Sequence, residues 1–90
     1  MRISDQITAD TWCQGSGEQD GKRCLLKWID YCYPAEERRE VEMRLINRIF
    51  GDAIRRNDGK RKLGMCLSVW NDARGRTVED VIKVTAECGV

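Results

Sequence analysis

The segment from Ala35 to Arg56, AEERREVEMRLINRIFGDAIRR, decides the fold of this chain. Its apolar residues recur as neighbouring pairs every four positions, the spacing of one face of an α-helix, at Leu45, Ile46, Ile49, Phe50, Ala53 and Ile54. The sequence therefore predicts a long amphipathic helix from about Ala35 to Arg56 that ends at Asn57-Asp58-Gly59. Gly51 falls inside this helix and is expected to weaken it by about 1 kcal/mol relative to alanine.

Shorter elements are expected before this helix. An apolar face predicts a helix that begins near Cys24 and ends before Pro34, because the residue before proline avoids helical geometry. That face consists of Leu25, Trp28, Ile29 and Cys32. Upstream, Asp20-Gly21 is a hairpin turn signal, so a small two-stranded ribbon is expected within Trp12–Leu26. The segment Ile3–Ala9 has room for one or two helical turns.

The segment Leu63–Trp70, which follows the long helix, fits two patterns. Its leucines and Trp70 have helical spacing, whereas Met65, Leu67 and Val69 alternate as in a half-buried strand. We favour a short buried helix, with a strand as the alternative.

A final helix is marked at its start and at its end. Thr77 and Asp80 form a capping-box pattern, and Gly89 is suited to close the helix. Apolar residues fall on one side of it, at Val78, Val81 and Ile82. Together the patterns predict a mainly α fold: one domain, residues 1–90, of about four helices with a short N-terminal β-hairpin.

Composition places the chain among ordinary globular domains. Hydrophobic residues make up 41% of it and charged residues 34%, a balance that excludes both a disordered chain and a membrane-spanning one. Its longest apolar run is far shorter than the roughly 20 residues of a spanning helix. Polar Ser4-Asp5-Gln6 near the start also excludes a secretory signal. We therefore expect a cytoplasmic location and no membrane partner.

The cysteine and histidine counts limit the chemistry. Five cysteines without an export signal predict free, buried thiols in a reducing compartment. The cysteines are Cys13, Cys24, Cys32, Cys66 and Cys88. The sequence gaps between them are too long for a metal knuckle or for a closely spaced redox pair. The absence of histidine removes Ser-His-Asp and Cys-His catalysis and imidazole metal ligands. We therefore expect no catalytic residue, no metal and no cofactor.

The segment Trp70–Val81, WNDARGRTVEDV, resembles the C-terminal signature of a bacterial and phage family of uncharacterised small domains. The chain departs from the family pattern at Lys27-Trp28, where small residues are expected, and at Arg74, where proline is usual. The resemblance extends to the N-terminal part, at Trp12, Gln14-Gly15 and Cys24-Leu25-Leu26. It implies a shared fold and a bacterial or phage setting, without an assigned reaction.

Three polar residues of this signature, Asn71, Asp72 and Arg76, have two interpretations. They serve local structure, because asparagine and aspartate favour turns and helix ends, or they converge on a small polar site. We favour the structural interpretation.

Charge is segregated along the chain although it nearly cancels overall, at +1. Residues 44–62 hold seven basic residues against two acidic ones, and we call the seven the basic surface: Arg44, Arg48, Arg55, Arg56, Lys60, Arg61 and Lys62. One interpretation is a solvated helix face with ion pairs such as Glu40–Arg44 and Asp52–Arg56. The other is a surface that binds nucleic-acid phosphates or an acidic protein.

These observations favour a non-enzymatic protein-interaction module, and in particular a phage-derived inhibitor of a bacterial host or defence complex that itself binds nucleic acid. The alternative is a small nucleic-acid-binding regulator that uses the basic surface. A pI near 7.6, against the values above about 9 that are typical of nucleic-acid-binding domains, favours a protein partner. An enzyme with carboxylate or thiol chemistry ranks last. If the basic surface is not the interface, Trp12 and the glycine-rich loop after it, which begins at Gln14-Gly15-Ser16-Gly17, are the next candidate.

Overall fold

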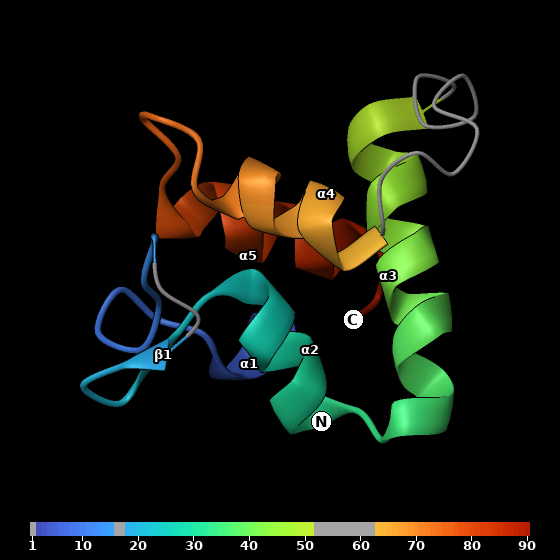
Figure 1. Ribbon diagram of the computed structural model, residues 1–90, viewed down its shortest axis with the longest axis horizontal. Helices are drawn as coiled ribbons and strands as arrows, with labels where there is room; N and C mark the ends of the chain where they lie inside the picture. Colours follow the sequence, from blue (N-terminus) through green and yellow to red (C-terminus); the bar gives the residue numbers. More distant parts are fainter. Residues whose placement is uncertain (1, 16–17, 52–62) are drawn as a thin grey trace.

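Five helices and one β-hairpin form within residues 2–15, 18–51 and 63–90, which are the residues that the computed structural model describes (Figure 1). In chain order they are α1 (Ile3–Gln6), β1 (Glu18–Gln19), β2 (Lys22–Arg23), α2 (Leu25–Cys32), α3 (Ala35–Phe50), α4 (Leu63–Asn71) and α5 (Val78–Glu87). This order confirms the predicted mainly α fold with an N-terminal hairpin. Among the described residues, no helix has both the length and the apolar character needed to cross a membrane.

The hairpin owes its tight turn to Asp20 and Gly21. Both have positive φ, 50° and 80°, as a two-residue type I′ turn requires at its two central positions. The turn aligns Glu18 with Arg23 in the antiparallel pair of β1 and β2. On its other side Arg23 pairs in parallel with Trp12, so the hairpin is joined to the segment that precedes it.

Proline separates α2 from α3, as the sequence predicts. Tyr33 adopts an extended conformation (φ −129°, ψ 139°) because the ring of Pro34 excludes helical geometry at the residue before it. Helix α3 then begins at Ala35 and buries Val41, Leu45 and Ile46 against the core.

The prediction that the long helix runs to Arg56 is wrong at Gly51. The α-helix ends at Phe50, and Gly51 is its C-cap with φ 55° and ψ −132°, a conformation that glycine adopts readily because it lacks a Cβ. Gly51 therefore terminates the helix rather than weakening its middle. The rest of the predicted helix, together with its expected stop at Asn57-Asp58-Gly59, lies outside the described residues.

Helix α4 resolves the ambiguous segment in favour of a helix. Cys66 and Leu67 are buried, but Met65 and Val69, one turn apart, are each 55% exposed. The expectation of a helix is therefore confirmed, whereas the expectation that it is buried holds for only one side. Met65 and Val69 lie on the outer face of the helix and Leu67 lies on its buried face. Because both faces carry apolar residues, the sequence alternates as a strand would.

Helix α5 begins with the predicted capping box. The backbone N–H of Asp80 donates to Thr77 Oγ1 at 3.3 Å, and the backbone N–H of Thr77 donates to Asp80 Oδ2 at 3.0 Å. Gly89 follows the helix with φ 71°, as expected of a glycine that closes one.

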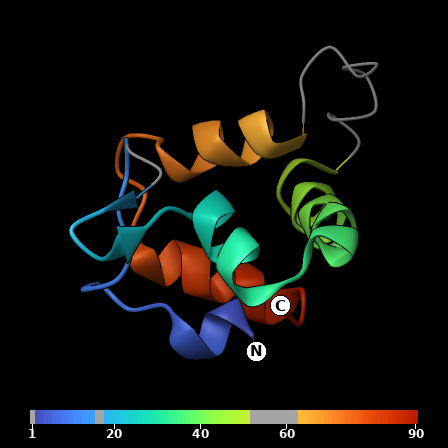
Figure 2. The same ribbon diagram turned by 60° about the horizontal axis from the view of Figure 1, so that its bottom comes forward.

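The helices pack around a shared core, with α3 running across the ends of α4 and α5 (Figures 1 and 2). Helix α1 lies against α5, and α2 contacts both α3 and α4. The fully buried apolar side chains come from every helix and include Ile3, Leu25, Ile29, Leu45, Ile46, Leu67 and Val81. This packing brings the end of α4 close to the segment around Trp12 and the start of α2.

Candidate functional site

Asn71, the last residue of α4, joins three segments through its buried side chain. Its Oδ1 accepts hydrogen bonds from Trp12 Nε1 at 2.7 Å and from the backbone N–H of Leu25 at 3.1 Å. Its Nδ2 donates to the Cys13 carbonyl at 3.1 Å and to Asp72 Oδ1 at 3.0 Å. The side chain is 0% exposed, and its amide uses both donors and two acceptor positions.

The loop after Trp12 is fixed to the same end of α4. Gln14 Nε2 donates to the carbonyls of Asn71 and Ala73, both at 2.9 Å. Asp72 Oδ1 accepts from the backbone N–H of Gly15 at 2.9 Å. We call this network the Asn71 junction, made of Trp12, Cys13, Gln14, Gly15, Leu25, Asn71, Asp72 and Ala73. It connects the two parts of the sequence that carry the family resemblance.

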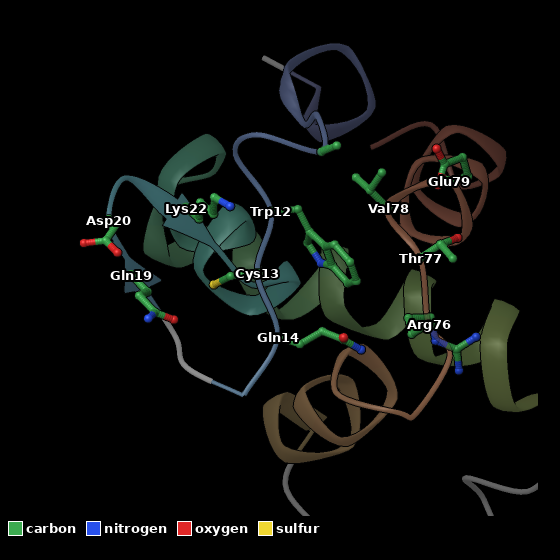
Figure 3. Close-up of a pocket in the computed structure, with 11 residues that line it drawn as sticks. Trp12, Cys13, Gln14, Gln19, Asp20, Lys22, Arg76, Thr77, Val78 and Glu79 are labelled. Atoms are coloured by element: carbon green, nitrogen blue, oxygen red, sulfur yellow. The ribbon is translucent and has the colours of Figure 1, made fainter.

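Arg76 has different contacts from Asn71 and Asp72. Its Nε donates to the Trp70 carbonyl at 2.9 Å, and its guanidinium lies 4.1 Å from the centroid of the Trp70 ring. Figure 3 shows its side chain pointing away from Trp12. The three predicted polar residues therefore do not converge on one group. The contacts of Asn71 and Asp72 are those of residues that hold segments together.

The described part of the basic surface forms ion pairs. Arg44 donates to Glu40 Oε1 at 2.9 Å, which is the predicted pair, and Arg48 donates to Glu87 of α5. The side chains of both arginines are more than half exposed, at 55% and 54%. The other members lie outside the described residues: Arg55, Arg56, Lys60, Arg61 and Lys62. Exposed pairs of this kind fit the solvated-face interpretation.

The five cysteines are less uniformly buried than expected. Cys24 and Cys66 are buried, whereas Cys13, Cys32 and Cys88 are half-buried. Burial raises the pKa of the thiols of Cys13, Cys32 and Cys88 above the ordinary value. Among the described residues, no three cysteine or carboxylate side chains are grouped closely enough to hold a metal ion.

A cleft of about 650 Å³ opens beside the Asn71 junction, between the hairpin and the start of α5 (Figure 3). We call it the Trp12 cleft. Its residues come from three segments: Ala9, Trp12, Cys13, Gln14, Gln19, Asp20, Lys22, Arg76, Thr77, Val78 and Glu79. The sequence pointed to this region through Trp12 with the glycine-rich loop and, separately, through Arg76. That these parts of the chain form one cleft was not predicted, because Arg76 to Glu79 lie 64 to 67 positions after Trp12.

The fold and this junction define a small, mainly helical domain whose N-terminal segment is joined by hydrogen bonds to the end of α4. The chain belongs to the family of unknown function DUF6197, whose model matches residues 2–89. This match confirms the resemblance to a family of uncharacterised domains. No curated protein and no solved structure matches the chain.

Proposed function

We propose that this domain is a non-enzymatic protein-interaction module that holds a segment of its partner in the Trp12 cleft. One observation carries the proposal: the Trp12 indole is fixed by its hydrogen bond to Asn71 and lines a concave surface. Tryptophans held rigidly in pockets are frequent energetic centres of protein interfaces, because they bury a large area at little entropic cost.

The walls of the cleft favour a polypeptide over a nucleic acid. Lys22 and Glu79 are exposed on opposite walls, and Asp20 and Gln19 lie beside Lys22. Mixed charges suit a protein segment with charges of both signs, whereas a nucleic acid requires a positive surface. The pairing of Arg44 with Glu40 and of Arg48 with Glu87 also reduces the net charge of the described basic surface.

A cytoplasmic location and an inhibitory role belong to the same proposal. The role of a phage-derived inhibitor of a bacterial host or defence complex rests on the small size of the domain and on the bacterial and phage setting that the resemblance implies. The alternative of a nucleic-acid-binding regulator rests on the basic surface.

Partner capture with charge-reversed variants tests the proposal. The parent chain is used to capture a partner from a bacterial lysate, and the partner is purified for titration. Lys22→Glu combined with Glu79→Lys should weaken binding at least tenfold, since opposite charges on both walls are exchanged. The matched control is Lys27→Glu on the exposed side of α2, outside the cleft, which should bind like the parent.

One further double variant and one titration separate the alternatives. If Arg44→Glu with Arg48→Glu abolishes binding while the cleft variant retains it, the basic surface is the interface and the cleft proposal is wrong. Steeply salt-dependent binding of the parent to random duplex DNA would favour the nucleic-acid alternative. All variants should keep the far-UV circular dichroism of the parent, because the changed side chains are exposed.

A further inference from the structure

Cys13 and Cys24 are the residues that directly follow the two partners of a parallel β-bridge. Trp12 and Arg23 form a parallel bridge, in which Arg23 N donates to the Thr11 carbonyl at 2.8 Å and Cys13 N donates to the Arg23 carbonyl at 3.3 Å. The next residue on the two segments is Cys13 and Cys24, respectively, and Cys24 is extended (φ −72°, ψ 171°). Paired strands lie about 4.8 Å apart, within the roughly 4.4–6.8 Å between Cα atoms that a disulfide spans.

The two thiols also lie on the same side of these segments. Successive side chains of an extended segment point to opposite sides, so Cys13 and Cys24 face away from the side of Trp12 and Arg23. Figure 3 shows the Cys13 sulfur directed toward the hairpin and the Trp12 indole directed toward α5. After burial, the Cys24 thiol is the largest cause of the raised pKa of Cys13. Such an effect requires the two groups to be close.

The two cysteines differ in solvent exposure. Cys13 is half-buried and lines the Trp12 cleft, whereas Cys24 is 6% exposed at the N-cap of α2. The remaining cysteines lie on other parts of the fold, at the end of α2, in α4 and after α5. A reagent from solvent therefore meets Cys13 before Cys24.

We propose that Cys13 and Cys24 form a dithiol site that small-molecule disulfides, such as glutathione disulfide, oxidise to an intramolecular disulfide. Cys13 releases its proton to solvent, and its sulfur attacks one sulfur of glutathione disulfide, whose S–S bond breaks so that one glutathione leaves as a thiolate. Cys24 then releases its proton, its sulfur attacks the Cys13 sulfur of this mixed disulfide, and the bond between Cys13 and glutathione breaks so that the second glutathione leaves as a thiolate. The two glutathione thiolates take up the two released protons. Two protein thiols are oxidised and one glutathione disulfide is reduced to two glutathione molecules.

The bond would tie the segment that contains Trp12 to the start of α2. It closes a short loop, which restricts the unfolded chain, so the oxidised protein should melt about 10 °C higher than the reduced one. Because the thiolate is the attacking species and the pKa of Cys13 is raised, the reaction should accelerate as the pH rises from neutral.

Peptide mapping of the native, folded chain tests the proposal. The reduced protein is incubated with glutathione disulfide, remaining thiols are alkylated, and cross-linked peptides are identified by mass spectrometry. We expect a Cys13–Cys24 cross-link to form first, and the thiol titre in denaturant to fall from five to three per chain. Cross-links that involve Cys32, Cys66 or Cys88 at equal or faster rates would overturn the proposal.

Single variants identify the resolving thiol. In Cys24→Ser the glutathione adduct on Cys13 should persist, whereas in the parent it should be transient; Cys24→Ala provides the same test if serine disturbs the fold. Cys32→Ser, the control at the other end of α2, should form the cross-link at the parent rate. A glutathione adduct on Cys13 that is equally stable in the parent and in Cys24→Ser would show that the two thiols do not react with each other.

Discussion

The Asn71 junction and the described basic surface are both held by polar side-chain contacts, yet they differ in burial. At the junction, one amide with no exposed surface is bonded to Trp12, Cys13, Leu25 and Asp72. At the basic surface, Arg44 and Arg48 form ion pairs with more than half of each side chain exposed. Buried donors that lose their acceptor cannot turn to water, whereas exposed charges can. The junction should therefore govern folding, and the basic surface should contribute little to stability.

The largest expected effect is that of Asn71→Ala. The change leaves Trp12 Nε1 and the backbone N–H of Leu25 without their acceptor, and each buried unsatisfied donor costs about 1–3 kcal/mol. We expect a loss of about 3 kcal/mol in the free energy of unfolding, which is a large part of a total on the order of 5 kcal/mol. Urea denaturation followed by tryptophan fluorescence measures it.

Asp72→Ala is the matched control for that experiment. Asp72 is exposed and also accepts two hydrogen bonds at the junction, so its loss should cost only about 1 kcal/mol. Equal losses for the two variants would mean that burial does not distinguish the residues of the junction.

A smaller effect is expected for Arg44→Gln on the basic surface. This arginine pairs with Glu40 four residues earlier on α3, and exposed pairs at this spacing contribute about 0.3–0.5 kcal/mol. The midpoint of urea denaturation should shift only slightly, and added salt should reduce even that shift. A loss comparable to that of Asn71→Ala would place the basic surface among the determinants of the fold.

The smallest effect concerns the pH dependence of the α5 cap. The hydrogen bond from the Thr77 backbone lowers the pKa of Asp80 below its ordinary value, and the Thr77 side chain and Arg76 act in the same direction. A carboxyl whose pKa is lower in the folded state stabilises the fold above its unfolded pKa, near 3.9, and this stabilisation is lost as the pH falls through the folded pKa. Asp80→Asn should therefore show a shallower fall in Tm below about pH 4 than the parent.

Glu42 supplies a control of opposite sign. Burial, followed by the nearby Asp30, raises the pKa of Glu42, so its contribution is present at low pH and is lost as the pH rises through that raised value. Glu42→Gln should remove this loss and leave unchanged the fall in Tm at acid pH that Asp80 controls.

For the Asp80 prediction, parallel Tm curves of Asp80→Asn and the parent would show that the cap does not respond to protonation of Asp80.

Local sequence signals predicted most of the described fold. Asp20-Gly21 predicted the turn of the hairpin, Pro34 predicted the break between α2 and α3, and Thr77 with Asp80 predicted the start of α5. Each of these signals acts within a few residues, so it can be recognised without knowing the tertiary structure. Gly51 was misinterpreted because glycine occurs both inside helices and at their C-caps, and the residues around it continue the helical pattern.

The site was harder to predict because its contacts join distant positions. Asn71 bonds to Trp12 and to Leu25, which are 59 and 46 residues away. The closeness of Cys13 and Cys24 arises from the parallel bridge at Trp12 and not from short sequence spacing. Their spacing in sequence does not indicate this closeness, because the bridge forms only in the folded chain.

The bond from Leu25 N to Asn71 has a consequence for folding kinetics. A helix begins with N–H groups that lack partners within the helix, and among the described contacts the N-cap residue Cys24 contributes no side-chain bond to them. The start of α2 therefore obtains its acceptor from α4, which lies 46 residues further along the chain. A short helix of this kind is unstable by itself, so α2 should become ordered only when α4 docks, and the rate of folding should depend on that long-range contact.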